Sequence, residues 1–138
     1  MSKKSWEDLQ PLRIPPGWTI VINKLENIEP EELDVDDERW LGAFTEDILY
    51  MHTKQKRKRN KQIEEQTLAI DLGWYPDSEP TGNFRLVALL NDNWQSPLLE
   101  FSSRSKQENI EVLEQWLFDE FILYRFIEED VFRKFHSK

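Results

Sequence analysis

Polar side chains on three expected strands could carry acid–base chemistry. Residues 47–53 (DILYMHT) alternate in polarity, which places Tyr50 and His52 on the face opposite the core. Asp71 points the same way on the following strand, and Arg85 is its diagonal neighbour across a hairpin. An imidazole, a carboxylate and a guanidinium on one sheet face can exchange protons with a substrate. Cross-strand charge pairing on a solvated face explains the same pattern, and we expect no catalytic role.

A run of basic residues follows directly. Residues 54–61 (KQKRKRNK) hold six cations in eight positions. Such a run can bind phosphates, dock on an acidic protein, or be a solvated loop. No aromatic residue lies within it, so it provides no platform for stacked bases. The six cations are Lys54, Lys56, Arg57, Lys58, Arg59 and Lys61.

An acidic run precedes both features. Residues 29–38 (EPEELDVDDE) hold seven acids in ten positions. A calcium loop beginning at Asp34 would need glycine where Arg39 stands and glutamate where Thr45 stands, so we predict no metal site. We expect a solvated loop with one helical turn from Pro30, whose negative surface can meet a basic partner. The candidate partner-binding residues are Glu29, Glu31, Glu32, Asp34, Asp36, Asp37 and Glu38, with the aromatic residues Tyr75 and Trp94 at loop tips as anchors.

Composition restricts the class of protein. The 138 residues fit one domain, 1–138, with 27 acidic and 18 basic side chains and a net charge of −9. That charge excludes a protein that coats nucleic acid with its whole surface. Without cysteine there is no disulfide, thiol nucleophile or cysteine zinc site, and no phosphate-loop motif indicates a cofactor. No stretch reaches the roughly 18 apolar residues of a membrane span, and the N-terminus lacks a secretory signal, so we expect a cytoplasmic protein.

The first half of the chain leaves one structural choice open. Residues 18–25 (WTIVINKL) alternate as a strand, and residues 39–46 form a short element anchored by aromatic side chains. Residues 46–66 are either one helix or two strands joined by a long basic loop. No apolar residue occurs between Met51 and Ile63, so a helix would bury almost nothing, and we favour the strands.

A hairpin is the clearest element. Residues 66–74 and 83–90 alternate around the turn cluster 76–82 (PDSEPTG), and residues 98–103 add a further strand. A slip of one residue would set the apolar face of one strand against the polar face of the other. The expected facing pairs are Trp74 with Phe84, Leu72 with Leu86, Ile70 with Ala88, and Leu68 with Leu90.

A long helix ends the chain. Ser105 and Glu108 form a capping box, and apolar residues at helical spacing from Ile110 to Val131 predict a helix of about 26 residues that begins near Lys106. A second apolar stripe requires cover from the N-terminal segment, from a second subunit in a homodimer, or from a partner. That stripe consists of Phe118, Ile122 and Phe126.

These observations predict an α+β fold, with an antiparallel sheet of four to five strands and a long C-terminal helix packed on one face. In size, acidity and tryptophan content the chain resembles small bacterial interaction proteins, including immunity proteins that block toxins, and this resemblance transfers no residue roles. We expect a non-catalytic protein–protein interaction or inhibitor module. The alternatives are a nucleic-acid accessory protein acting through residues 54–61, and an enzyme using His52, Asp71 and Arg85.

Overall fold

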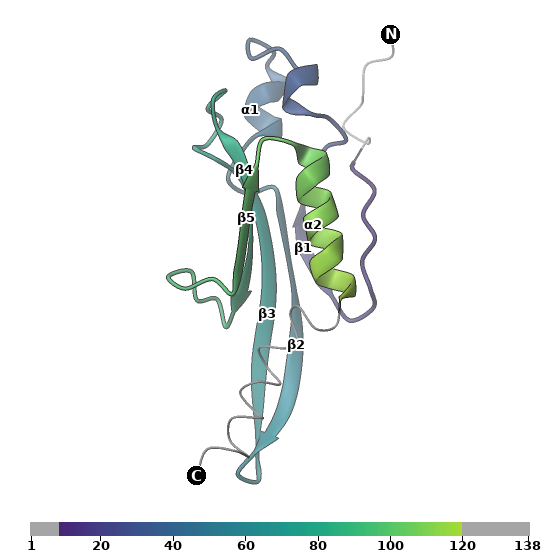
Figure 1. The fold of residues 1–138 in the computed structure, drawn as a ribbon, viewed down its shortest axis with the longest axis vertical. Helices are drawn as coiled ribbons and strands as arrows, with labels where there is room; N and C mark the ends of the chain where they lie inside the picture. Colours follow the sequence, from purple (N-terminus) through teal and green to yellow (C-terminus); the bar gives the residue numbers. More distant parts are fainter. Residues whose placement is uncertain (1–8, 120–138) are drawn as a thin grey trace.

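The computed structural model describes residues 9–119 of the 138 and confirms the α+β fold. Five strands form one antiparallel sheet in the order β1-β2-β3-β4-β5 (Figure 1). The elements are β1 (Thr19–Asn23), η1 (Pro30–Glu32), α1 (Arg39–Ala43), β2 (Leu49–Arg59), β3 (Gln62–Tyr75), β4 (Asn83–Leu90), β5 (Leu99–Ser103) and α2 (Lys106–Phe118).

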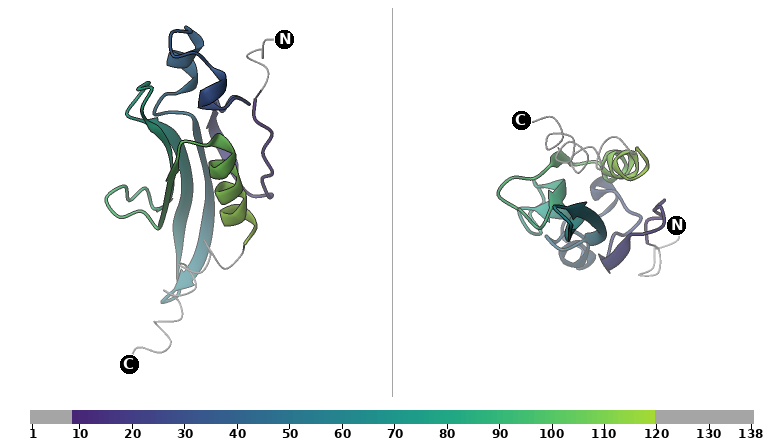
Figure 2. Two further views of the ribbon diagram at one scale, coloured as in Figure 1. Left: turned by 45° about the horizontal axis from the view of Figure 1, so that its top comes forward. Right: turned by 90° about the horizontal axis from the view of Figure 1, so that it is seen from below.

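Helix α2 covers one face of the sheet (Figure 2). Its buried stripe, which includes Ile110, Leu113 and Leu117, packs into the main core beneath it. Ser105 caps its N-terminus, since the Ser105 Oγ accepts a hydrogen bond from the Glu108 N–H at 3.1 Å. The segment before β1 runs along the outer side of the helix, where the Arg13 N–H donates to a Glu114 carboxylate oxygen at 3.0 Å.

The helix is shorter than the pattern predicts. It ends at Phe118, because Asp119 has extended backbone (φ −91°, ψ 104°). Burial supplies most of the stability of a helix in a protein, and Leu117 is the last α2 residue in the core. Phe118 is already about half exposed. The remaining residues of the expected helix, from 120 onward, lie outside the described residues.

Four aromatic rings close the core at the end of the sheet beside α1. Trp40 and Phe44 come from α1 and its C-terminus, and they contact Trp74 of β3 at ring-centroid distances of 5.8 and 4.8 Å. Phe84 of β4 meets Trp74 edge-on at 5.1 Å. The short element expected over residues 39–46 is therefore confirmed, and Trp74 belongs to the core.

The register of the β3–β4 hairpin is the expected one. All four predicted pairs face each other, from Leu68 opposite Leu90 to Trp74 opposite Phe84. Leu68, Ile70, Leu72 and Trp74 are all buried in the main core. The alternation of apolar and polar residues over 66–74 therefore predicted correctly which side chains face the core.

The expected basic loop does not exist. Strand β2 continues through the basic run to Arg59, and β3 begins at Gln62, so only Asn60 and Lys61 form the turn. Both turn residues have positive φ, 50° and 65°, as a two-residue type I′ hairpin turn requires. The helix considered for residues 46–66 is likewise excluded. This part of the chain lacks the apolar alternation of a buried strand. Its basic residues in β2 instead pair with acidic residues of β3 in the antiparallel register, where Arg57 stands opposite Glu64.

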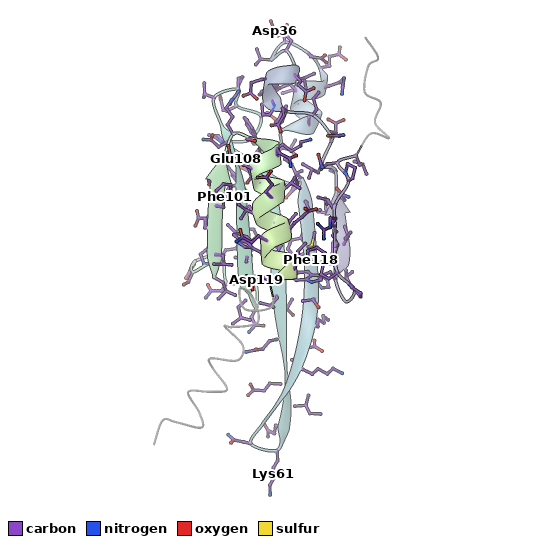
Figure 3. The ribbon with its side chains drawn as sticks, turned by 45° about the vertical axis from the view of Figure 1, so that its right-hand side comes forward. Asp36, Lys61, Phe101, Glu108, Phe118 and Asp119 are labelled. Carbon is purple, nitrogen blue, oxygen red and sulfur yellow. The ribbon has the colours of Figure 1, made fainter. Side chains whose placement is uncertain are left out.

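The outer half of this hairpin leaves the sheet. Strand β1 pairs with β2 no further than His52, and β4 pairs with β3 no further than Leu68. Residues 54–67 therefore form a two-stranded ribbon without a third strand, and Figures 1 and 3 show it projecting from the body. We call residues 54–67 the ribbon. Within residues 9–119, no helix has the length and hydropathy needed to span a membrane.

Candidate functional site

The sheet-face residues lie close to their predicted positions. Tyr50 stands directly opposite Asp71, and Arg85 stands opposite Gly73, diagonal to Asp71. Their side chains have other partners, however. The Arg85 Nε donates to a Glu100 carboxylate oxygen at 3.0 Å, and no hydrogen bond within residues 9–119 joins Arg85, Asp71 and His52.

Burial changes the chemistry of this face. Asp71 is only 7 % exposed, so the solvated face expected around it is wrong. Ala69, Val87 and Leu89 form a small second apolar cluster on this face, with Tyr50 packed against it. Loss of hydration and, to a smaller extent, the nearby Asp47 carboxylate raise the pKa of Asp71 to about 7, although Arg85 opposes the shift.

Tyr50 is held in its neutral form. Burial first, and then a hydrogen bond to Asp92, raise its pKa to about 12. The Tyr50 Oη donates to an Asp92 carboxylate oxygen at 3.0 Å. The ring of His52 lies 6.2 Å from that of Tyr50, and its Nδ1 is buried without a hydrogen-bond partner. One perturbed carboxyl group without a connected base or nucleophile does not complete an acid–base site.

Most carboxylates of the acidic run accept hydrogen bonds or form ion pairs within the molecule. Glu29 accepts from the backbone N–H groups of Lys106 and Gln107, at 2.7 and 2.9 Å, and so binds the first turn of α2. Glu31 pairs with the guanidinium of Arg104 at 3.0 Å. The expected helical turn is present as η1, and Glu32 accepts from the Glu29 N–H at 2.9 Å.

Two aspartates of the same run stabilise its turns. Asp34 accepts from the Asp36 N–H at 3.0 Å, and Asp37 accepts from the Arg39 N–H at 2.9 Å. Five of the seven predicted partner-binding acids therefore bond to other groups of the chain, although most of these side chains remain exposed. No group of three or more His, Asp and Glu side chains in the described part of the chain is placed to hold a metal ion.

The predicted aromatic anchors do not form one surface. Tyr75 ends β3 and is half-buried, with the Arg85 guanidinium 5.9 Å from its ring. Trp94 is 45 % exposed in the loop after β4, at the opposite end of that strand. Of the predicted dimer stripe, Phe118 has the Arg13 guanidinium 5.0 Å from its ring, while residues 122 and 126 lie outside the described residues. The homodimer stays a prediction.

The ribbon divides into a balanced stem and a basic tip. In the stem, Lys56 stands opposite Glu65 and Arg57 opposite Glu64, and the Lys54 Nζ lies 3.6 Å from a Glu65 carboxylate oxygen. Nearer the turn, Lys58 pairs with Ile63 and Arg59 pairs with Gln62 in the strand register. We call residues 58–63 the tip. It carries three cations and no acid.

Charge is segregated along the whole molecule. The ribbon holds six of the 18 basic residues and two of the 27 acidic ones, so it carries +4 while the remainder carries −13. Figure 3 shows Asp36 of the acidic run and Lys61 of the tip at opposite ends of the long axis. The two runs therefore do not neutralise each other within one molecule.

The sequence interpretation missed Ile63, which is 73 % exposed at the tip, and the pairing role of Glu64 and Glu65. Aligning residues 54–59 antiparallel to residues 62–67 would have revealed the opposed charges. Comparison of the chain with protein-family models, with curated proteins and with solved structures finds no match. The functional argument therefore starts from the ribbon.

Proposed function

We propose that this protein is a non-catalytic binding module that docks on an acidic macromolecular surface through the tip of its ribbon. One observation carries the proposal: the projecting two-stranded ribbon holds six basic residues and two acidic ones, with Lys61 exposed in its turn, while the rest of the chain is strongly acidic. The same ribbon supplies no residue to either apolar core.

The length of the ribbon supports this role. Six cross-strand pairs, from Lys54 with Thr67 to the turn, extend about 20 Å at about 3.3 Å per residue. The Debye length at physiological ionic strength is about 8 Å, so solvent ions screen the acidic body from an anion at the tip. A polyanion can therefore contact the tip although the whole chain carries −9.

Retention on heparin–agarose tests the proposal with the full chain. A protein of this net charge should flow through a polyanionic matrix, so retention at about 50 mM salt would report a local basic site. We expect retention, and we expect Lys61→Gln to elute at lower salt. Lys24→Gln is the matched control, because Lys24 is an exposed cation in the loop after β1. Flow-through of the unmodified chain would refute the proposal.

The acidic end is a second candidate surface, for a basic protein partner in the manner of an immunity protein. It is supported by two exposed aliphatic side chains, Val35 and Leu41, which lie within and just after the acidic run. Apolar contacts ringed by charge are typical of the centre and rim of an interface. Charge complementarity there would chiefly raise the association rate.

Photo-crosslinking in cells compares the two ends directly. A photoreactive amino acid replaces Lys61, Leu41 or Lys24 in separate variants of the full chain. We expect a discrete crosslinked product at position 61 and none at the control position 24. A product at position 41 without one at position 61 would transfer the proposal to the acidic end.

A cytoplasmic location is part of the proposal, because the chain lacks the cysteines on which many small secreted domains depend.

A further inference from the structure

We infer that residues 120–138, which follow α2 in the chain, dock on the sheet face opposite α2 and cover Ala69, Val87 and Leu89. We call this sheet face the second face. The inference is independent of the proposed function, because it concerns a different surface from the ribbon. Three observations support it: the burial of the second face, the composition of residues 120–138, and the distance that they have to span.

The second face is buried, although the described residues supply little to cover it. Ala69, Val87 and Leu89 are at most 1 % exposed. Within residues 9–119, Tyr50 is the one partly buried apolar residue that packs against them. The buried apolar residues of α1 and α2 all belong to the main core on the other face. The second face therefore needs a further layer that excludes water.

Asp71 shows how far such a cover extends. Its side chain lies on the second face beside Val87, and it is only 7 % exposed. Antiparallel sheets commonly keep one face in water, and polar residues then alternate outward with apolar residues that face the core. A carboxyl group at this position would be hydrated on an open face. The cover therefore reaches from Leu89 at least to Asp71 along the strands.

The composition of residues 120–138 suits such a layer. Nine of the 19 residues are aliphatic or aromatic, whereas Ile63 is the single apolar residue of the ribbon. Segments that stay solvated contain few aromatic and β-branched residues, so this composition indicates a segment that packs on a surface. Four acidic and four basic residues balance within it. It therefore approaches the acidic body without net repulsion.

The segment is long enough to reach the second face. Helix α2 ends at Phe118, and Asp119 has extended backbone, so the chain leaves the helix axis there. Packed layers lie about 10 Å apart, so the path from α2 around the sheet is about 20 Å, or about six extended residues. The other residues, about 13 in number, span about 20 Å even at the helical rise of about 1.5 Å. The three strands that line the second face lie within about 10 Å.

Residues 120–138 fit this face better than a second copy of the protein does. A segment tethered to α2 meets the second face at an effective concentration on the order of millimolar. A second copy has no such advantage, and it brings another net charge of −9 to a molecule of the same charge.

Photo-crosslinking within the full chain tests the inference. A photoreactive phenylalanine analogue replaces Phe126, near the middle of the segment. We expect it to crosslink within one molecule to Ala69, Val87 or Leu89, as mapped by mass spectrometry. The same analogue at Leu41, which is exposed beside the acidic run, should not crosslink to these residues. A crosslinked dimer would overturn the inference in favour of a second copy, and crosslinks confined to residues outside the second face would also overturn it.

A second variant tests whether the segment keeps water from the second face. Ile122→Ser with Phe126→Ser removes two apolar side chains and alters no residue of the main core. We expect the pKa of Asp71, followed by carbon NMR of its carboxyl group, to fall from about 7 toward 3.8, because water then reaches this group. Leu41→Ser is the matched control and should leave that pKa at about 7. An unchanged pKa in the double variant would overturn the inference.

Discussion

At the scale of single residues, Asp71 departs most from ordinary behaviour. Its carboxyl group stands across from Tyr50 on one side and Val87 on the other, in a face that excludes water from it. Burial is the main reason that its pKa rises from 3.8 to about 7. The positive charge of Arg85 lowers this pKa only partly, because the Arg85 guanidinium also bonds to Glu100. Near neutral pH this group titrates in the folded protein.

Asp71 should therefore make stability depend on pH. Between about pH 4 and 7 the folded carboxyl group keeps its proton while the unfolded one has lost it, so the free energy of unfolding falls as pH rises. The loss is about 1.4 kcal/mol per pH unit in that window. Asp71→Asn should be neutral near pH 4 and stabilise the protein at pH 8 by up to about 4 kcal/mol.

Urea unfolding of both proteins at the two pH values measures this difference. Subtracting the two curves cancels the titration of the other acids, which both chains share. A difference in the free energy of unfolding that does not change with pH would contradict the burial argument for Asp71.

At the scale of elements, the ribbon and the sheet differ in what stabilises them. Residues 68–74 of β3 have neighbours on both sides and face α2 or the small second cluster. Residues 54–66 pair only with one another in the described sheet, and the backbone N–H and C=O of Thr67 also bond to Asn91. A two-stranded hairpin is marginal in water without a third strand or a covering helix.

Amide hydrogen exchange should show this contrast within one strand. We expect the amides of residues 62–67 to exchange far faster than those of residues 68–74, because the ribbon opens without unfolding the core. Lys61→Gly should slow exchange in the ribbon, since a left-handed backbone costs a non-glycine residue about 1 kcal/mol. Equal protection along the whole of β3 would show that the ribbon is coupled to the core.

At the scale of the whole molecule, topology separates the charges. The acidic run lies beside α1, and the hairpin carries the basic residues to the other end of the long axis (Figure 3). The acidic pole also serves the fold, because Glu29 holds the first turn of α2.

Removing the outer ribbon should separate binding from folding. Replacing residues 56–65 by Asn-Gly joins Gln55 to Gln66 through a two-residue turn and keeps the same type of flanking pair as Arg59 with Gln62. It deletes five basic and two acidic residues, so the net charge moves from −9 to −12. We expect the free energy of unfolding to change by less than about 0.5 kcal/mol, because no core residue is lost.

The same variant should lose retention on heparin. Thermal and urea unfolding, measured beside heparin elution, provide both readouts. A loss of more than about 2 kcal/mol of stability would show that the ribbon supports the fold, and unchanged retention on heparin would show that binding lies elsewhere.

Features that depend on apolar periodicity could be predicted from the sequence. The β3–β4 register follows from alternation, because any slip of one residue would expose the residues that pack around Trp74. The Ser105 cap of α2, which accepts a hydrogen bond from the Glu108 N–H, requires only local spacing. Features that depend on distant neighbours were predicted wrongly: the end of α2 at Phe118, and the solvation of Asp71.

The sequence by itself determined the fold class, the hairpin register, the start of α2 and the existence of two opposed charge runs. Only the tertiary structure decided what those runs do. Opposed charges across β2 and β3 stabilise a ribbon that has no apolar pattern to reveal it, and the pairing of β1 and β4 decides where that ribbon leaves the sheet. Burial likewise decided that Asp71 titrates near neutrality, because hydration is lost to neighbours far away along the chain.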